Sequence, residues 1–305
     1  MSATASRICV AHLVHEANGL QALERFLRSY RAHEAGAEHD LVLLLKGFDA
    51  ADAARRHVEL AGPGTGTLLV GSAGYDLGAY WSAVERLPHE LLVFVNSFSE
   101  VLAEDWLGKL TRALDDPSVG VAGATGSWNS QRGYLAYQLG LPSPYAEAFP
   151  SRREARLALL ELHGDRDRGW MAHKAGTAWD YLLRQRGLGT FPAPHLRTNA
   201  FAASRELLAR VAPPPIRAKR DAHRFESGPH GLTGQVQALG LRCVVVGRDG
   251  VRYDVADWPR SNTFNQAAQE NLLVADNRTS LYDASDVTGR QVLAWLAWGR
   301  DGHAA

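Results

Sequence analysis

The sequence predicts an α/β fold in which a mostly parallel central sheet is flanked by helices. Short apolar runs recur through the first 128 residues, and they lack the polar alternation of strands that face water on one side. A stretch with helical spacing or composition separates most of these runs from the next. Strands that are buried on both faces and joined through helices are typical of a parallel sheet.

The first 128 residues contain the elements of this sheet in regular order. The apolar runs predict strands at residues 8–14, 41–48, 67–71, 91–95 and 119–124. The segments between them predict helices at residues 20–32, 50–60, 79–86 and 103–114. In the first helix, Leu20, Leu23 and Leu27 recur on one face, so we expect that face to pack on the sheet.

The middle of the chain interrupts this alternation. Residues 129–189 are rich in Arg, Ala and Leu and predict a helical insertion, with helices at residues 152–163 and 177–185. We expect a single domain over residues 1–305, in which this insertion separates a first half, residues 1–128, from a second half, residues 190–305.

The second half returns to mixed structure. Residues 195–211 predict a loop that runs into a helix, and a short helix at residues 232–239 ends at Gly240. A strand follows at residues 241–246, and residues 247–278 are expected to be largely loop.

Composition excludes several classes of protein. The 33 Lys and Arg residues balance 33 Asp and Glu residues, which argues against a nucleic-acid binder. No apolar run approaches the roughly 20 residues of a membrane span, and no secretory signal is apparent, so we expect a cytoplasmic protein without stable membrane insertion. Cys9 and Cys243 lie in apolar runs without metal-ligand spacing, and we interpret both as small buried hydrophobic residues.

The loops that follow the strands are the places to look for a ligand site, because ligands of parallel sheets bind beyond the carboxyl ends of the strands. Residues 71–80 join a predicted strand to a helix, where Gly74 and Gly78 would let a phosphate approach the backbone and Tyr80 lies just beyond. The alternative is a plain loop in which Asp76 caps the helix. Residues 62–67 precede a strand instead of a helix, and we interpret them as a turn.

The loop at residues 95–100 places Asn96 and Ser97 at the carboxyl edge of the sheet, or is simply a helix entry capped by Ser99. In residues 195–201, Arg197 can clamp a phosphate and His195 can act as acid, base or ligand. The alternative is that Thr198 or Asn199 caps a helix there.

Residues 223–231 place Glu226 in a Gly- and Pro-rich loop ahead of a helix. Its carboxylate is a candidate general base, or a charge that stabilises the next helix N-terminus. Residues 248–264 can fold over a ligand or wrap the surface, and residues 276–279 are expected to be a turn. The sequence contains neither a nucleophile elbow nor a dinucleotide fingerprint.

Together, these loops resemble those of GT-A-type, family 2-like glycosyltransferases of bacterial surface-polysaccharide synthesis, including the rhamnan-synthesis-type transferases. The resemblance covers roughly residues 7–128 and 190–250. It rests on YDLG at 75–78, LLVFVNSFSEVLAEDWLGKL at 91–110, HLRTNAFAASRELL at 195–208 and FESGPHGLTGQVQALGLRCVVVG at 225–247.

The resemblance implies a hexosyltransferase-type enzyme that moves a sugar from a nucleotide-diphosphate sugar to a glycan or lipid-linked acceptor. It implies that the first half binds the donor and the second half faces the acceptor. The insertion and the loop at 248–264 are polar-rich additions beside the predicted sheet edge, so we expect both to border the acceptor side. It also implies Mn²⁺ or Mg²⁺ held by an Asp-x-Asp motif, but this chain has Asn96-Ser97-Phe98 at that place, and Phe98 cannot bind a metal. Lys46 stands where the family has an acidic residue.

Roles for individual residues follow from the resemblance. Without a metal, Lys46, Arg197 and Arg224 are the cations expected to stabilise the departing diphosphate. Glu226 or Asp76 would accept the proton of the acceptor hydroxyl, and His195 is a third catalytic candidate. The expected contacts to the nucleotide-sugar are Lys46, Gly74, Asp76, Gly78, Tyr80, Asn96, Ser97, Arg197, Asn199 and Arg224.

Two other functions stay open. The missing Asp-x-Asp motif favours a non-catalytic GT-A-like binding or scaffolding protein as the alternative, and a different nucleotide-using α/β enzyme is a third. The sequence leaves the donor, the acceptor and the oligomeric state open.

Overall fold

The computed structural model describes residues 6–138, 141–146, 187–211, 213 and 215–299. Within this part of the chain, an eight-stranded sheet has the order β11-β10-β6-β9-β4-β1-β2-β3. Its strands are β1 (Ile8–His15), β2 (Asp40–Lys46), β3 (Gly66–Val70), β4 (Leu91–Val95), β6 (Val119–Gly123), β9 (Ala200–Ser204), β10 (Arg242–Val246) and β11 (Arg252–Tyr253). The predicted mostly parallel α/β sheet is confirmed, because β3, β2, β1 and β4 pair in parallel and β6 pairs in parallel with β10.

One strand of the sheet was expected to be loop and helix. Residues 195–211 form β8 (His195–Leu196), strand β9 and only then helix α9 (Arg205–Arg210). Strand β9 lies antiparallel between β4 and β6. Its alanines and Phe201 are fully buried, so a segment without polar alternation inserts into the middle of the sheet.

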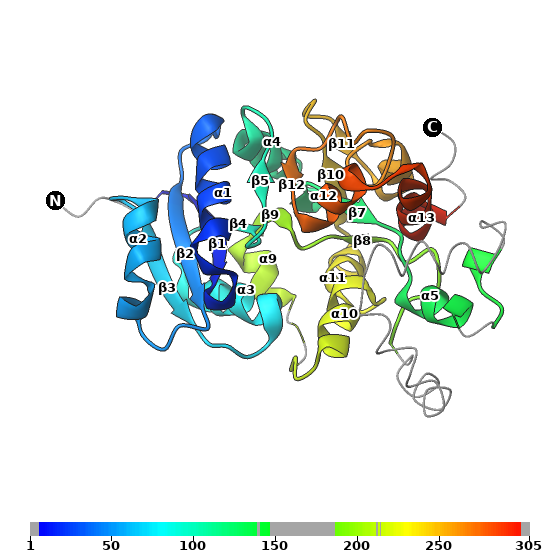
Figure 1. Cartoon of the computed structure of the whole chain (residues 1–305), viewed down its shortest axis with the longest axis horizontal. Coiled ribbons are helices and arrows are strands. Elements are labelled where there is room, and N and C mark those ends of the chain that lie inside the picture. The colour runs from blue at the N-terminus through cyan, green and yellow to red at the C-terminus, as the bar shows by residue number, and fades with distance from the viewer. Residues whose placement is uncertain (1–5, 139–140, 147–186, 212, 214, 300–305) are drawn as a thin grey trace.

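Helices cover both faces of the sheet (Figure 1). On one face, α1 (Gly19–Ala32) and α4 (Trp106–Arg112) pack with the side chains of Val10 and Val14. On the other face lie α3 (Tyr75–Arg86), α9, α10 (Lys219–Ser227) and α11 (Leu232–Ala238), packed with Cys9 and Leu13. The first half also contains α2 (Arg55–Ala61) and the short 3-10 helices η1 (Glu16–Asn18), η2 (Ala51–Ala54) and η3 (Ala113–Asp115).

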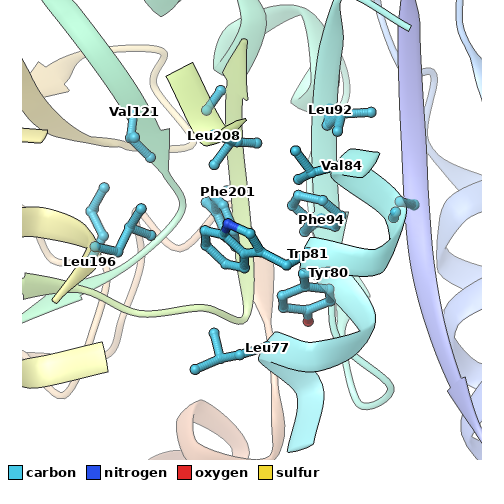
Figure 2. Packing of buried hydrophobic residues seen from close by; sticks show 14 of the residues in the cluster. Leu77, Tyr80, Trp81, Val84, Leu92, Phe94, Val121, Leu196, Phe201 and Leu208 are labelled. Atoms are coloured by element: carbon cyan, nitrogen blue, oxygen red, sulfur yellow. The ribbon is translucent and has the colours of Figure 1, made fainter. Parts of the chain in front are cut away.

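The aromatic side chains of α3 pack in the core on the face of the sheet that α3, α9, α10 and α11 cover (Figure 2). Tyr80 lies against Phe94 of β4 with ring centroids 4.6 Å apart, and Phe94 lies 5.3 Å from Phe201 of β9. The indole nitrogen of Trp81 donates to the carbonyl of Val211, 2.8 Å away. These contacts fix the middle of α3 relative to β4 and β9, which come from different halves of the chain.

The C-terminal elements gather at the end of the molecule opposite β3 (Figure 1). They include α12 (Asn277–Ala284), α13 (Val287–Trp298) and the 3-10 helix η5 (Val255–Arg260), near α5 (Gln131–Gln138) and η4 (Pro144–Ala146). Two short ribbons complete this region: β5 (Glu100–Val101) pairs with β12 (Val274–Ala275), and β7 (Gly126–Ser127) pairs with β8. The predicted helices at 152–163 and 177–185 lie outside the described residues.

Two local predictions are wrong. The segment 276–279, expected to be a turn, caps α12, because the Asp276 side chain accepts hydrogen bonds from the backbone N–H groups of Arg278 and Thr279. Glu226, expected in a loop, lies on helix α10.

Both cysteines are free and buried, as expected, and burial raises the pKa of each thiol to about 12. Among the described residues, no helix has the length and apolar content to cross a membrane.

Candidate functional site

A cavity of 510 Å³, here called the central cavity, lies beyond the carboxyl end of β4, at the edge of the sheet where a ligand was expected. Its titratable lining residues are Asp76, Tyr134, His195, Arg197, His223, Glu226, Asp276 and Arg278. Amides and hydroxyls surround them, notably Asn96, Asn129, Gln131, Thr198, Asn199, Asn265 and Asn277. Phe264, Leu281, Leu293 and Leu296 add an apolar part.

The cavity unites one part of the predicted site and leaves out another. The predicted residues that line it are Asp76, Asn96, His195, Arg197, Asn199 and Glu226. The predicted residues absent from its lining are Lys46, Gly74, Gly78, Tyr80, Ser97 and Arg224. Residues from strand ends and helices that are far apart in the sequence therefore meet in one place.

Lys46 does not line the cavity but bonds to the backbone at the start of α3. Its buried ammonium group donates to the carbonyl oxygens of Ala73, at 3.4 Å, and of Tyr75. The backbone there is left-handed at Gly74 (φ 78°) and at Tyr75 (φ 54°), a conformation that non-glycine residues rarely adopt. A Cβ atom on Gly78 would lie 2.3 Å from the Ala73 carbonyl oxygen, so only glycine fits this position. Lys46 thus holds the tight turn that begins α3.

Asp76 lies in the first turn of α3 and does not cap the helix, since Gly74 is the N-cap residue. The residue is exposed, yet protein atoms crowd its carboxylate, and this partial desolvation raises the pKa of Asp76 above its usual range. The charges of Lys46 and His15 act in the opposite direction.

Glu226 faces the same cavity from α10. The hydroxyl of Thr198 donates to its carboxylate at 3.0 Å. Burial raises the pKa of Glu226, the nearby charge of Asp76 adds to the rise, and the Thr198 hydrogen bond opposes it. A carboxylate with a raised pKa in a cavity is suited to take up and release a proton.

His195 is held as a neutral imidazole. Its Nδ1 lies 2.7 Å from the carbonyl oxygen of Ala193, and because a carbonyl only accepts, Nδ1 carries the proton. Burial, assisted by the charge of Arg197, lowers the pKa of His195 to about 4. At neutral pH the Nε2 atom therefore has a lone pair and can accept a proton or a hydrogen bond.

Arg197 is a fixed cation in the cavity wall. One guanidinium nitrogen lies 2.6 Å from the carboxylate of Asp276, and another donates to the hydroxyl of Thr125 at 3.2 Å. The guanidinium carbon lies 4.0 Å from the centre of the Phe264 ring. Since a guanidinium has five N–H groups, the remaining ones can meet an anionic ligand.

Asn96 and Asn199 brace the end of β4. The Asn96 side-chain oxygen accepts from the backbone N–H of Phe98 at 3.0 Å and from the hydroxyl of Ser99 at 2.9 Å. The Asn199 side-chain oxygen accepts from Thr125 at 2.6 Å.

This donor set does not fit the divalent metal that the family resemblance implies. The one side-chain oxygen of Asn96 already accepts two hydrogen bonds, and the side chain of Phe98 has no oxygen to offer a metal ion. Within the described part of the chain, no group of three or more His, Cys, Asp or Glu side chains is placed to hold a metal ion.

The other predicted contacts are structural. Tyr80 is buried, and its hydroxyl lies 3.4 Å from the carbonyl oxygen of Thr198. This contact links α3 to the segment just before β9. Ser97 is buried and lies outside the cavity lining. Arg224 lies on α10, where its guanidinium is 3.7 Å from Asp221.

The cavity also contains residues that the sequence prediction missed. His223 precedes Glu226 by three residues, which places both on one face of α10; this spacing is informative only when the segment is known to be a helix. Asp276 was detectable as the start of a helix, because Asp is a preferred N-cap residue.

Comparison with known proteins finds similarity in shape alone. No family model matches this chain, and no curated protein sequence matches it. A mannosyltransferase from Pyrobaculum calidifontis, solved with GDP-Man and Mn²⁺, is 16% identical over 85% of this chain and 62% of its own, with a TM-score of 0.44. Glucosyl-3-phosphoglycerate synthase from Mycobacterium tuberculosis, solved with Mn²⁺, UDP and phosphoglyceric acid, is 15% identical over 76% and 65%, with a TM-score of 0.41.

A third similar structure is 4-diphosphocytidyl-2C-methyl-D-erythritol synthase from Anaerococcus prevotii, at 12% identity over 72% of this chain and 82% of that one, with a TM-score of 0.37. The chain spans less than two thirds of the length of the two glycosyl-transferring structures. At such low identity and superposition, the likeness assigns no residue and no activity to this chain.

Proposed function

We propose that this protein is a glycosyltransferase that moves a sugar from a nucleotide-diphosphate sugar to a hydroxyl group of a glycan or lipid-linked acceptor. The observation that carries the proposal is the meeting of a fixed cation, Arg197, with the carboxylates of Glu226 and Asp76 in one cavity at the carboxyl edge of the sheet. The resemblance of the loops to those of family 2-like transferases supports the same reaction.

The transfer needs a base and a place for negative charge. In the proposed step, Glu226 takes the proton from the acceptor hydroxyl while the acceptor oxygen bonds to the anomeric carbon. The bond from that carbon to the phosphate oxygen breaks, and its electron pair leaves with the nucleoside diphosphate. The guanidinium of Arg197 stabilises this leaving anion.

The surrounding residues assist in stated ways. Asp76 is the second candidate base, and its charge keeps the pKa of Glu226 raised. His195, neutral near pH 7, offers Nε2 as a hydrogen-bond acceptor to a sugar hydroxyl. By the resemblance, we propose bacterial surface-polysaccharide synthesis in the cytoplasm as the setting.

The roles assigned to Arg197 and Glu226 are tested by substituting each residue and measuring both donor binding and sugar transfer. UDP-, GDP- and dTDP-sugars are titrated by calorimetry with and without Mn²⁺, and transfer is measured with any donor that binds. We expect Arg197→Ala to weaken donor binding and Glu226→Gln to lower the transfer rate about a hundredfold or more while donor binding remains. The matched controls are Arg220→Ala and Glu206→Gln, which alter exposed residues of α10 and α9. Failure of every nucleotide-sugar to bind would refute the proposal.

The second candidate is a GT-A-like protein that binds a nucleotide-sugar without transferring it. It is favoured by one observation, namely that Asn96-Ser97-Phe98 replaces the acidic motif and does not fit a metal. This candidate is supported if the protein binds a donor but transfers its sugar to none of the acceptors tried. The Glu226→Gln variant should then bind the donor as the unaltered protein does.

A further inference from the structure

The loop of residues 261–272, here called the 261–272 loop, has an unusual backbone. Four of its non-glycine residues are left-handed, with φ of 55° at Asn262, 48° at Asn265, 40° at Ala267 and 53° at Gln269. Non-glycine residues adopt this conformation rarely, and it persists where the surrounding structure enforces it, often at functional sites.

Two buried glutamine side chains enforce it here. The side-chain oxygen of Gln266 accepts from the backbone N–H of Asn262 at 2.6 Å, and that of Gln269 accepts from the N–H of Asn265 at 3.0 Å. The Gln266 amide nitrogen donates to the carbonyl of Trp258 at 2.7 Å. The loop is therefore held by side-chain amides in place of a regular hydrogen-bond ladder.

The loop presents two neighbouring residues to the central cavity. Phe264 lies against the guanidinium of Arg197, and its carbonyl oxygen accepts from the Trp298 indole at 2.8 Å. Asn265 lies next in the chain, beside the apolar part of the cavity that includes Leu293. The 261–272 loop thus connects the fixed cation to a second region of the same cavity.

Asn265 has an unsatisfied hydrogen-bond acceptor. The residue is 5% exposed, and its side-chain amide nitrogen donates to the carbonyl of Leu293 at 3.2 Å. Its side-chain oxygen is buried, and no group in the described part of the chain donates to it. A buried polar atom of this kind calls for an explanation, because leaving it unpaired is costly. Asn265 is one of the residues that line the cavity, so a ligand bound there is the nearest source of the missing donor.

We propose that Asn265 is a specificity-determining residue that accepts a hydrogen bond from a hydroxyl group of the sugar acceptor. The inference rests on the proposed function, because it treats the ligand beside Glu226 as the acceptor, while Arg197 faces the diphosphate of the donor. A buried, rigidly held carbonyl oxygen selects a hydroxyl donor and rejects an analogue that lacks it, since the oxygen then stays unpaired. The apolar neighbours accept the C–H face of a sugar ring.

The test is a double-mutant cycle in which Asn265 is substituted in the protein and single hydroxyl groups are removed from the ligand, and the binding affinity is measured for each combination. Methyl glycosides of glucose, galactose, mannose and rhamnose, with their monodeoxy analogues, are titrated by NMR into the full chain. The variants are Asn265→Gly, which suits the left-handed backbone and removes both contacts, and Asn265→Asp, which keeps an acceptor oxygen and loses the donor to Leu293. Each variant is also titrated with UDP and GDP, and its unfolding is measured.

We expect removal of one particular hydroxyl to weaken binding to the unaltered protein about tenfold. The same removal should have little effect on Asn265→Gly and a clear effect on Asn265→Asp. A merely structural role would make the two variants alike, because both lose the bond to Leu293.

Equal effects of every deoxy substitution in the unaltered protein and in Asn265→Gly overturn the inference. Binding of UDP or GDP without binding of any glycoside also overturns it and leaves the proposed function standing. Hydroxyl coupling without nucleotide binding supports the role of Asn265 as a sugar contact and refutes the transferase.

Discussion

Residues 6–127 and residues 187–299 meet at the central cavity, but they build its wall in different ways. The first region contributes regular elements, with Asp76 at the start of α3 and Asn96 at the end of β4. The second contributes most of the charged groups, including Arg197, Glu226 and Asp276. The first region thus lines the cavity with residues of regular elements, and the second, which has more irregular segments, supplies most of the charged groups of the wall.

The two regions also hold their charges differently. Lys46 in the first half has its ammonium group bound by backbone carbonyls and kept out of the cavity. Arg197 in the second half is paired with a buried carboxylate and faces the cavity. Lys46, at the end of a predicted strand, therefore stabilises the backbone at the start of α3. Arg197, which lines the cavity, is instead held in place by its ion pair with Asp276.

The largest expected effect concerns the base in the second half. Glu226→Gln should lower the transfer rate about a hundredfold or more, because the proton acceptor is lost. Stability near neutral pH should not fall. Burial raises the pKa of Glu226 in the folded state, so ionisation disfavours folding as the pH rises through that pKa, and glutamine removes this penalty. Transfer assays and urea unfolding measure both, and Glu206→Gln is the control. Retained transfer would contradict the role.

The next effect compares a buried with an exposed ion pair. Asp276→Asn should destabilise the fold by about 3 kcal/mol, because it leaves Arg197 charged without its partner while asparagine still caps α12. Asp105→Asn breaks the exposed pair with Arg112 in the first half and should cost less than about 1 kcal/mol. Urea unfolding compares the two variants. Equal losses would mean that the cavity wall is not rigid.

A third effect concerns acid stability. Folding lowers the pKa of His195 from 6.5 to about 4, so its contribution is present above pH 6.5 and disappears as the pH falls toward 4. The difference corresponds to about 3 kcal/mol. His195→Gln should therefore lose less stability than the unaltered protein between pH 7 and pH 4. The buried His12 of the first half, with a pKa lowered to about 3, remains as a common background. Parallel pH profiles of the two proteins would contradict this.

The smallest effect concerns Lys46 in the first half. Lys46→Met should destabilise the fold by about 1 kcal/mol, because the bonds to the carbonyls at the start of α3 are lost while a buried charge is removed. It should also raise the pKa of Asp76 further, since the charge of Lys46 lowers it, and this is measurable by NMR titration of the carboxylate. The control is Lys109→Met, whose ammonium bonds the Glu104 carbonyl at an exposed position. An unchanged Asp76 pKa would exclude the coupling.

The strands of the first half were predictable because burial on both faces leaves a local mark. Residues 8–14 and 91–95 are continuous apolar runs, and they form β1 and β4. Strand β9 was missed, because the small residues around Phe201 become a strand only when β4 and β6 lie on either side of them. Glu226 was placed in a loop for a similar reason, since α10 has few apolar residues and is stabilised by packing on α3 and α11.

For the site, the sequence by itself determined which polar residues follow strands or precede helices, and so singled out Asp76, Asn96, His195, Arg197 and Glu226. It did not determine the direction or the partner of each side chain. Lys46 points to carbonyls 27 and 29 residues away, and Arg197 pairs with a carboxylate 79 residues away. Local patterns record the burial of a segment, whereas hydrogen-bond partners depend on which distant elements the tertiary structure brings within about 3 Å.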